Sequence, residues 1–500
     1  MVDPVLSVFH PSFAGRVGIA RRRLCVPEGI HARSWGRSNE QDLPGTHRPL
    51  FATVLSVAGE DSSEPLFLVS LDLGWWRRLS DEWRLRAPLL ERLDLDPSRL
   101  LICMNHTHSG PTCSVSLEDK PGGDKVAPFL QQLEQSIFEA CIEAQDRATP
   151  ATLAWNTGGC SLAANRDLPD PDSEDAAPAR TLCGFNPRTP ADDTLLVGRV
   201  TDIEGRVIAT IVNYACHPTT LGWTNRTQSP DWIGAMREMV ETHTEGAPCL
   251  FLQGASGELA PREQYVSDPS VADKNGRQVG YAVLSTLEGM LPPGQALRYD
   301  AVVESGAALA IWKYATHQAP KRLQSLVVKI PIKIKENLPS QAQLRKRLAT
   351  DLDSVLTERL ERQLHLRESL GDAAWFELPI WVWQLGDSIV VAQLNEAYSD
   401  LQTELRQRYP ELAIIVVNLA NGSCGYLPRD AAYDRETYQV LQTPFARGSL
   451  EQLIAACSET IQLVLSRSDH ALQPHFHRSA ALATESLLPS RQEMNNSSQV

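Results

Sequence analysis

Short apolar runs alternate with amphipathic segments along most of the chain. The clearest apolar runs have the length of buried strands and lie at 65–72, 100–104, 247–253 and 413–418. The segment 126–145 instead repeats apolar residues at helical spacing. Strands and helices that alternate in this way predict an α/β fold.

Histidines follow two of the predicted strands. The strand at 100–104 runs into the segment 105–111 (NHTHSGP), and the strand at 207–214 runs into His217. Residues i and i+2 of an extended chain face the same way, so His106 and His108 can point into one pocket. An isolated pair of this kind is more often a pair of ordinary loop residues, so the other strand ends decide between the two interpretations.

Oxygen-bearing side chains occupy comparable positions. Asp72 ends a predicted strand, Glu396 follows the strand at 388–393, and Tyr426 lies in a Gly-rich loop. Sites in open α/β sheets collect at the carboxyl ends of strands, and these side chains are acceptable zinc ligands or neighbours. The alternative for Glu396 is structural: it is expected to open a helix that runs to about residue 409, where the helix dipole favours an acid.

Composition and charge narrow the function classes. The 500 residues include 42% hydrophobic and 22% charged residues, as in a soluble globular protein, and the formal net charge is −14. That charge argues against nucleic acid or an anionic membrane as the main partner.

Targeting signals and cysteine usage predict the compartment. No apolar run approaches the length of a membrane span, and the segment 1–4 (MVDP) does not resemble the start of a secretory signal. The ten cysteines form no CxxC pair, so we expect reduced thiols. A cytoplasmic location is predicted, while the oligomeric state stays open.

The predicted domain organisation is simple. Residues 1–466 are expected to form one domain, with a candidate sub-boundary near 300 where the composition shifts. A long charged helix is predicted over 339–370. The polar, Ser- and Asn-rich segment 467–500 is predicted to be a disordered tail.

Several motifs, in one linear order, resemble the neutral/alkaline non-lysosomal ceramidase family. They are NHTHSGP at 105–111, Asn165-Arg166, NYACHPT at 213–219, GELAP at 257–261, Glu396, Gly425-Tyr426 and Tyr438. The resemblance covers roughly residues 15–466. It implies a large mixed-sheet α/β catalytic domain with flanking helices and a zinc-dependent amidase of sphingolipid metabolism that cleaves the N-acyl bond of ceramide.

The resemblance also implies roles for individual residues. The zinc ligands would be His106, His217, Glu396 and Tyr426. The catalytic residues would be His108, beside the metal, together with Arg166 and Tyr438, which would bind the amide carbonyl or its oxyanion. Zinc chemistry suits the reaction, because a zinc ion lowers the pKa of bound water to about 7 and polarises a carbonyl.

Two departures leave the substrate open. The family carries a serine where this chain has Ala260, and its additional immunoglobulin-like domain has no counterpart in the sequence. A smaller soluble N-acyl substrate is therefore as plausible as a lipid. Two other functions stay open: a zinc-dependent esterase or other acyl hydrolase, and a catalytically decayed ligand-binding protein on the same scaffold.

Overall fold

The computed structural model describes residues 6–38, 41–60, 64–173, 180–350 and 352–467. Contacts divide the chain into a large unit, Met1–Val464, and a second unit, Leu465–Val500. The candidate boundary near residue 300 falls inside a strand of the large unit. The segment 1–4 and, apart from Arg467, the tail predicted over 467–500 lie outside the described residues.

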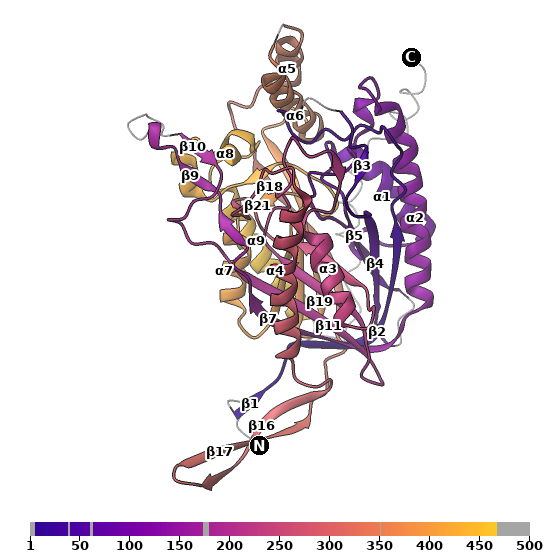
Figure 1. Cartoon of the computed structure of the whole chain (residues 1–500), viewed down its shortest axis with the longest axis vertical. Coiled ribbons are helices and arrows are strands. Elements are labelled where there is room, and N and C mark those ends of the chain that lie inside the picture. Colours follow the sequence, from indigo (N-terminus) through magenta and orange to yellow (C-terminus); the bar gives the residue numbers. More distant parts are fainter. Residues whose placement is uncertain (1–5, 39–40, 61–63, 174–179, 351, 468–500) are drawn as a thin grey trace. The chain divides into compact units, whose positions relative to one another are not determined.

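A mixed eight-stranded sheet is the largest element of the structure (Figure 1). Its strands are antiparallel in the middle, and the pairs β12–β14 and β5–β6 at its two edges are parallel. In spatial order the strands are β14 (Cys249–Gln253), β12 (Val207–Tyr214), β11 (Thr194–Asp202), β7 (Thr149–Gly159), β2 (Ser12–Arg23), β4 (Phe51–Ala58), β5 (Leu66–Leu71) and β6 (Leu100–Met104).

The sheet curves so strongly that its two edges approach each other. The hydroxyl of Ser70 in β5 donates to the carbonyl of Phe251 in β14 at 2.7 Å. Strand twist of a fixed hand accumulates across many strands, and this curvature is its consequence. It brings the chain that follows β6 close to the chain that follows β12, although the two strands are six positions apart in the sheet.

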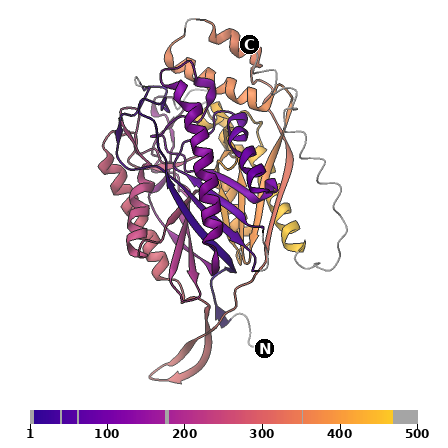
Figure 2. The same ribbon diagram turned by 90° about the vertical axis from the view of Figure 1, so that its right-hand side faces the viewer.

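Four helices pack on one face of this sheet. Their apolar stripes and the strands form two buried clusters, one under α1 (Leu79–Leu93) and α2 (Val126–Asp146), the other under α3 (Trp232–His243) and α4 (Pro269–Glu288). Figure 2 shows α2 lying along the strands. Helix α4 begins at Pro269, because the Asp268 side chain caps it by accepting a hydrogen bond from Ser270 N.

A second, four-stranded sheet adjoins the first near β12 and β14. Its order is β18 (Leu323–Lys333), β19 (Trp375–Leu385), β20 (Ser388–Gln393) and β22 (Ala413–Val417). The side chain of Asn213 donates to Val416 O at 2.9 Å, and Asn418 N donates to Gln253 O at 3.0 Å. These bonds tie the carboxyl end of β22 to the same edge at which β12 and β14 end. The mixed-sheet α/β class predicted from the sequence is confirmed.

Short strand pairs and a hairpin complete the sheets. The pairs are β3 (Gly45–Thr46) with β13 (Thr227–Gln228), β8 (Ala163–Asn165) with β15 (Leu259–Pro261), β9 (Asp167–Pro169) with β10 (Thr181–Cys183), and β21 (Glu396–Ala397) with β23 (Tyr426–Leu427). The hairpin of β16 (Gln295–Glu304) and β17 (Ala308–Thr316) pairs with β1 (Ser7–Val8). No sequence pattern predicted this hairpin.

The single helix predicted over 339–370 is wrong. The chain forms two helices there, α5 (Gln341–Leu348) and α6 (Ser354–Leu370). Each has its own start signal: Ser340 makes a capping box with Gln343, and the Asp353 carboxylate accepts hydrogen bonds from Val355 N and Leu356 N.

The helix expected to open at Glu396 is also wrong. Glu396 N donates to Gly425 O at 3.0 Å and Tyr398 N to Leu427 O at 3.1 Å, so these residues are extended. The helix α7 (Asp400–Arg408) begins after them. Helices α8 (Tyr438–Gln442) and α9 (Ser449–Arg467) follow.

Among the described residues, every helix is too short or too polar to cross a bilayer.

Candidate metal centre

His106 sits in an unusual backbone conformation at the end of β6. Its φ is +71°, in the left-handed region that non-glycine residues seldom adopt. A backbone hydrogen bond to the segment after the neighbouring strand β5 fixes this conformation: His106 N donates to Leu73 O at 2.9 Å. The ring Nδ1 lies 3.2 Å from Gly74 O. A strained backbone of this kind persists only where the surrounding contacts fix it firmly, which is common at functional sites.

His217 is held in a comparable way after β12. Its ring Nδ1 lies 3.0 Å from Leu259 O. Since a carbonyl oxygen can only accept, the proton of each imidazole is on Nδ1 and the lone pair is on Nε2. Burial, followed by the nearby Arg166, lowers the pKa of His217 to about 3, so this ring is neutral.

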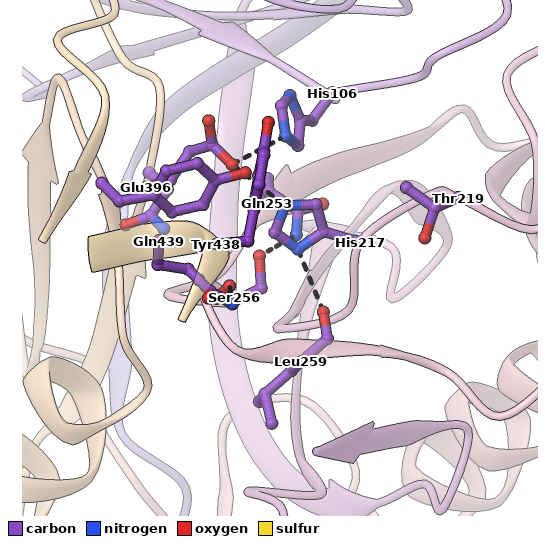
Figure 3. A network of polar contacts seen from close by, with 12 residues as sticks. His106, His217, Thr219, Gln253, Ser256, Leu259, Glu396, Tyr438 and Gln439 are labelled. Carbon is purple, nitrogen blue, oxygen red and sulfur yellow. Dashed lines mark hydrogen bonds and ion pairs between the residues drawn. The ribbon is translucent and has the colours of Figure 1, made fainter. Parts of the chain in front are cut away.

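Glu396 faces both lone pairs. Its Oε2 is 3.1 Å from His106 Nε2 and 3.0 Å from His217 Nε2 (Figure 3). The three side chains are buried, and their ligand atoms lie within 4.8 Å of one another.

The cluster has the chemistry of a metal site. Two imidazole nitrogens and a carboxylate oxygen point their lone pairs at one another, which is unfavourable unless a cation lies close to them. His217 Nε2 also has a charged donor within reach, Arg166 Nη2 at 3.2 Å. Two histidines and a glutamate are a common zinc ligand set, and backbone carbonyls on Nδ1 are the usual second partners of metal-bound histidines. The group can hold a divalent metal ion.

Tyr426 lies beside this group. It is the register partner of Glu396 in the β21–β23 pair, and its phenol is close enough to the Glu396 carboxylate to feel its charge. Burial, reinforced by the charge of Glu396, raises the pKa of the phenol well above its usual range. The phenol is therefore protonated beside the carboxylate.

Arg166 reaches the cluster from the opposite strand pair, after β8. Its guanidinium donates to Gly257 O at 2.7 Å through Nη2 and at 3.1 Å through Nε. The same Nη2 lies 3.2 Å from His217 Nε2 and 3.4 Å from the Tyr426 hydroxyl. A buried positive charge thus stands directly against the candidate ligands.

His108 lies next to His106 but makes different contacts. Its ring packs between Trp35, at 4.7 Å, and Trp75, at 5.0 Å between centroids. Neither ring nitrogen has a hydrogen-bond partner among the described residues. Burial, with the neighbouring His106 and His217, lowers the pKa of His108 well below its usual range. A neutral imidazole with both nitrogens free faces the cavity.

Tyr438 begins α8, and Figure 3 shows its ring beside Glu396. Its hydroxyl accepts a hydrogen bond from Arg362 Nη1 at 3.0 Å, which leaves the phenol proton free to donate. Burial raises the pKa of this phenol. Together with His106, His108, Glu396 and Tyr426, it lines a cavity of about 70 Å³.

The structure therefore brings together all seven predicted site residues. Asp72, the remaining strand-end acid, is elsewhere: it is fully buried in an ion pair with Arg237 and is not among the cavity-lining residues.

Sequence reasoning missed several residues that line the cavity, among them Trp75, Arg77, Arg362 and His365. The only local signal was the i, i+3 spacing of Arg362 and His365, which places them on one face of α6.

Comparison with known proteins supports the fold. No family model matches the chain. Two similar solved structures are described as a ceramidase complexed with C2 and as the neutral ceramidase from Pseudomonas aeruginosa. Each has a TM-score of 0.63 and 15% identity and covers 91% of this chain; the chain covers 76% of the first structure and 75% of the second. The resemblance to ceramidases is confirmed as a resemblance of fold.

Proposed function

We propose that the protein is a zinc-dependent amidohydrolase that cleaves an N-acyl amide. The observation that carries the proposal is the convergence of His106 Nε2, His217 Nε2 and Glu396 Oε2, within 4.8 Å of one another, at the wall of a cavity. Among the described residues no other group of this kind was found.

His106, His217 and Glu396 would hold the metal, with Tyr426 as the fourth ligand. A bound zinc ion would supply a water of lowered pKa and polarise the scissile carbonyl. The donor set fits zinc rather than calcium or magnesium, which prefer ligand sets made of oxygen alone.

The remaining residues have roles that follow from their contacts. Arg166 keeps a positive charge beside the ligands, and Tyr438 has a phenol proton that its bond from Arg362 leaves available. Both are placed to bind an oxygen on which negative charge develops, which typically contributes a few kcal/mol per donor. His108 is neutral and unpartnered, so it can take a proton and return it to the leaving amine.

An esterase is the nearest alternative, because the same groups would stabilise the intermediate of ester hydrolysis. Decay to a binding protein has less support. Ala260, where the family carries a serine, is 1% exposed in β15 and is not among the cavity-lining residues. A mechanism that uses metal-activated water does not need a serine at position 260.

The test combines metal content with hydrolysis. Purified protein should contain close to one zinc per chain, and an N-acyl amide with a chromogenic amine should be cleaved faster than its background rate. His106→Ala should abolish both properties. His31→Ala, which removes another buried histidine outside the cluster, is the matched control.

Two results would contradict the proposal: full activity in rigorously metal-free protein, or undiminished zinc content in His106→Ala. A matched ester that is cleaved while the amide is not would instead favour the esterase.

A further inference from the structure

One wall of the cavity is cationic, and the proposed hydrolysis uses it only through the hydrogen bond from Arg362 to Tyr438. Arg77, from the loop before α1, and Arg362 and His365, from α6, line this wall. Trp75 contacts both this wall and the metal cluster: the Arg362 guanidinium is 5.6 Å from one of its ring centroids. The His106 ring lies 5.5 Å from Trp75, centroid to centroid.

The positive charges of this wall exceed the negative charges paired with them. Glu358 is the carboxylate shared by the two arginines: its Oε1 lies 3.0 Å from Arg362 Nε and 3.8 Å from Arg77 Nη1. Burial favours its neutral form, but Arg362 and Arg77 outweigh burial and lower the pKa of Glu358.

Other nearby carboxylates on α6 already have partners. Glu361 pairs with Lys120 at 3.0 Å, and Glu368 pairs with Arg78 at 2.9 Å and with Arg345 at 3.0 Å. One carboxylate therefore serves two buried arginines, and a net positive charge faces the cavity.

Donors of the wall are also left without partners. Arg77 is 7% exposed and His365 is 6% exposed, yet Arg77 Nε and His365 Nδ1 have no hydrogen-bond partner among the described residues. His365 Nε2 lies 3.3 Å from the Ser116 hydroxyl, which can donate to it and leave the ring proton on Nδ1. Buried donors are normally satisfied, so an acceptor from outside the chain is missing here.

We propose that this wall binds an anionic group of the substrate, a carboxylate or a phosphate, so that the N-acyl substrate is acidic. This inference rests on the proposed amidohydrolase function. A guanidinium fork and an imidazole N–H match the oxygens of such groups. The cavity volume of about 70 Å³ is small beside the roughly 300 Å³ or more of pockets for larger ligands, which favours a compact acidic group over an alkyl chain.

The position of the wall links charge recognition to bond cleavage. Arg362 donates to the Tyr438 hydroxyl, and Tyr438 lies beside Glu396 (Figure 3). An anion that binds between Arg77 and Arg362 therefore lies one side chain away from the residues proposed to bind the scissile carbonyl. The amine half of an N-acyl amino acid carries its carboxylate on the carbon next to the amide nitrogen, so the two groups of such a substrate are also close together.

The experiment compares substrates that differ in charge, using the full zinc-loaded chain. An N-acylglycine, an N-acylethanolamine and an N-acylaminoethyl phosphate with the same short acyl chain provide carboxylate, neutral and phosphate arms. We expect kcat/KM to be at least tenfold higher for one or both acidic substrates than for the neutral one. The acidic arm with the higher value identifies the anion.

Two variants test whether the preference for acidic substrates comes from the cationic wall. Arg77→Gln should lower kcat/KM at least tenfold more for the preferred acidic substrate than for the neutral one. Arg78→Gln removes the neighbouring arginine, which pairs with Glu368 and is not among the cavity-lining residues, and should leave the preference unchanged. Circular dichroism checks that both variants fold, and the comparison on the unaltered protein needs no variant.

Equal kcat/KM for acidic and neutral substrates overturns the inference, and so does an Arg77→Gln variant that loses both activities equally. If no substrate is cleaved, the amidohydrolase proposal fails instead. Calorimetric binding of the same compounds then decides the inference alone, since tighter binding of an acidic compound upholds it and equal binding overturns it.

Discussion

Two neighbouring strand ends of the large sheet carry buried acid–base clusters of opposite character. Asp72 follows β5, and His106 follows β6, its parallel neighbour. Asp72 is 0% exposed and accepts from Arg237 Nη1 at 2.8 Å and from Arg237 Nη2 at 2.6 Å. The Asp72 carboxylate also accepts hydrogen bonds from the Asn105 side-chain amide at 2.6 Å and from Phe51 N at 2.9 Å. Its charge and its lone pairs are satisfied within the protein.

The cluster at His106 is not satisfied in this way. The Glu396 carboxylate faces two imidazole nitrogens that carry lone pairs, because the protons of both rings are held by backbone carbonyls. The comparison teaches that a polar residue at a strand end is no evidence of a site by itself. The deciding feature is whether its acceptors meet donors or meet other acceptors.

The largest effect is expected from a substitution that disrupts the acceptor cluster. Glu396→Gln replaces the anionic ligand by a neutral amide, so zinc content should fall to well below one per chain and hydrolysis by a factor on the order of 10³. Metal analysis and initial rates measure this. Glu361→Gln, on the surface pair with Lys120, is the control and should change neither. Retention of stoichiometric zinc would show that Glu396 is not a ligand.

The matching change in the satisfied cluster should act on stability. Asp72→Asn leaves the buried Arg237 without its counter-ion, which typically costs about 3–5 kcal/mol of unfolding free energy. Urea unfolding measures this loss, and the zinc content of the folded protein should not change. The double variant with Arg237→Gln should be less destabilised than the single one. If Asp72→Asn lost zinc but kept normal stability, Asp72 would belong to the metal site and not to a purely structural ion pair.

A third buried carboxyl, Glu258, sharpens the comparison because its hydrogen-bond donors are neutral groups. The backbone N–H and hydroxyl of Ser399 donate to it. Burial raises its pKa from 4.5 to about 8, so the folded state keeps a proton that the unfolded state releases. The unfolding free energy should therefore fall as pH rises from about 4.5 to about 8, by at most ~1.4 kcal/mol per pH unit.

Glu258→Gln should remove this part of the pH dependence. Denaturation curves at pH 5 and pH 8 provide the measurement, and the variant should gain relative stability at pH 8. An unchanged pH profile would show that Glu258 is ionised in the folded protein.

The smallest effect is expected at Ala260. Its side chain lies in the β8–β15 pair opposite Ala164 and is not among the cavity-lining residues. Ala260→Ser should therefore change kcat/KM by less than about twofold, since catalysis is assigned to groups elsewhere. Steady-state kinetics would detect a larger change, and a tenfold gain would demonstrate a serine-dependent step.

Much of the fold could be predicted from local patterns. Helix α2 was expected at 126–145 and is observed at Val126–Asp146, and strand β6 was expected and observed at 100–104. Both have strong periodicity or a continuous apolar run, which depends on neighbouring residues alone. The hairpin β16–β17 was missed, because its residues are mostly exposed or half-buried and the strands have no buried face that would require an apolar pattern.

The site was predicted unevenly for the same physical reason. The two histidines could be found because each directly follows a buried strand. Glu396 was predicted as a site residue but with the wrong local structure, since its extended conformation depends on backbone bonds to Gly425 and Leu427, some thirty residues away. Arg362 and His365 resemble the ordinary charged face of a helix until α6 packs over the cavity.

The sequence by itself determined the strands, the helices and the residue types available at the strand ends, because these depend on short-range periodicity and turn chemistry. Only the tertiary structure decided which of those residues meet. The curvature of the eight-stranded sheet brings the ends of β6 and β12 together, and pairing of β21 with β23 adds Glu396 and Tyr426. Convergence of this kind depends on contacts between distant segments, which no local pattern encodes.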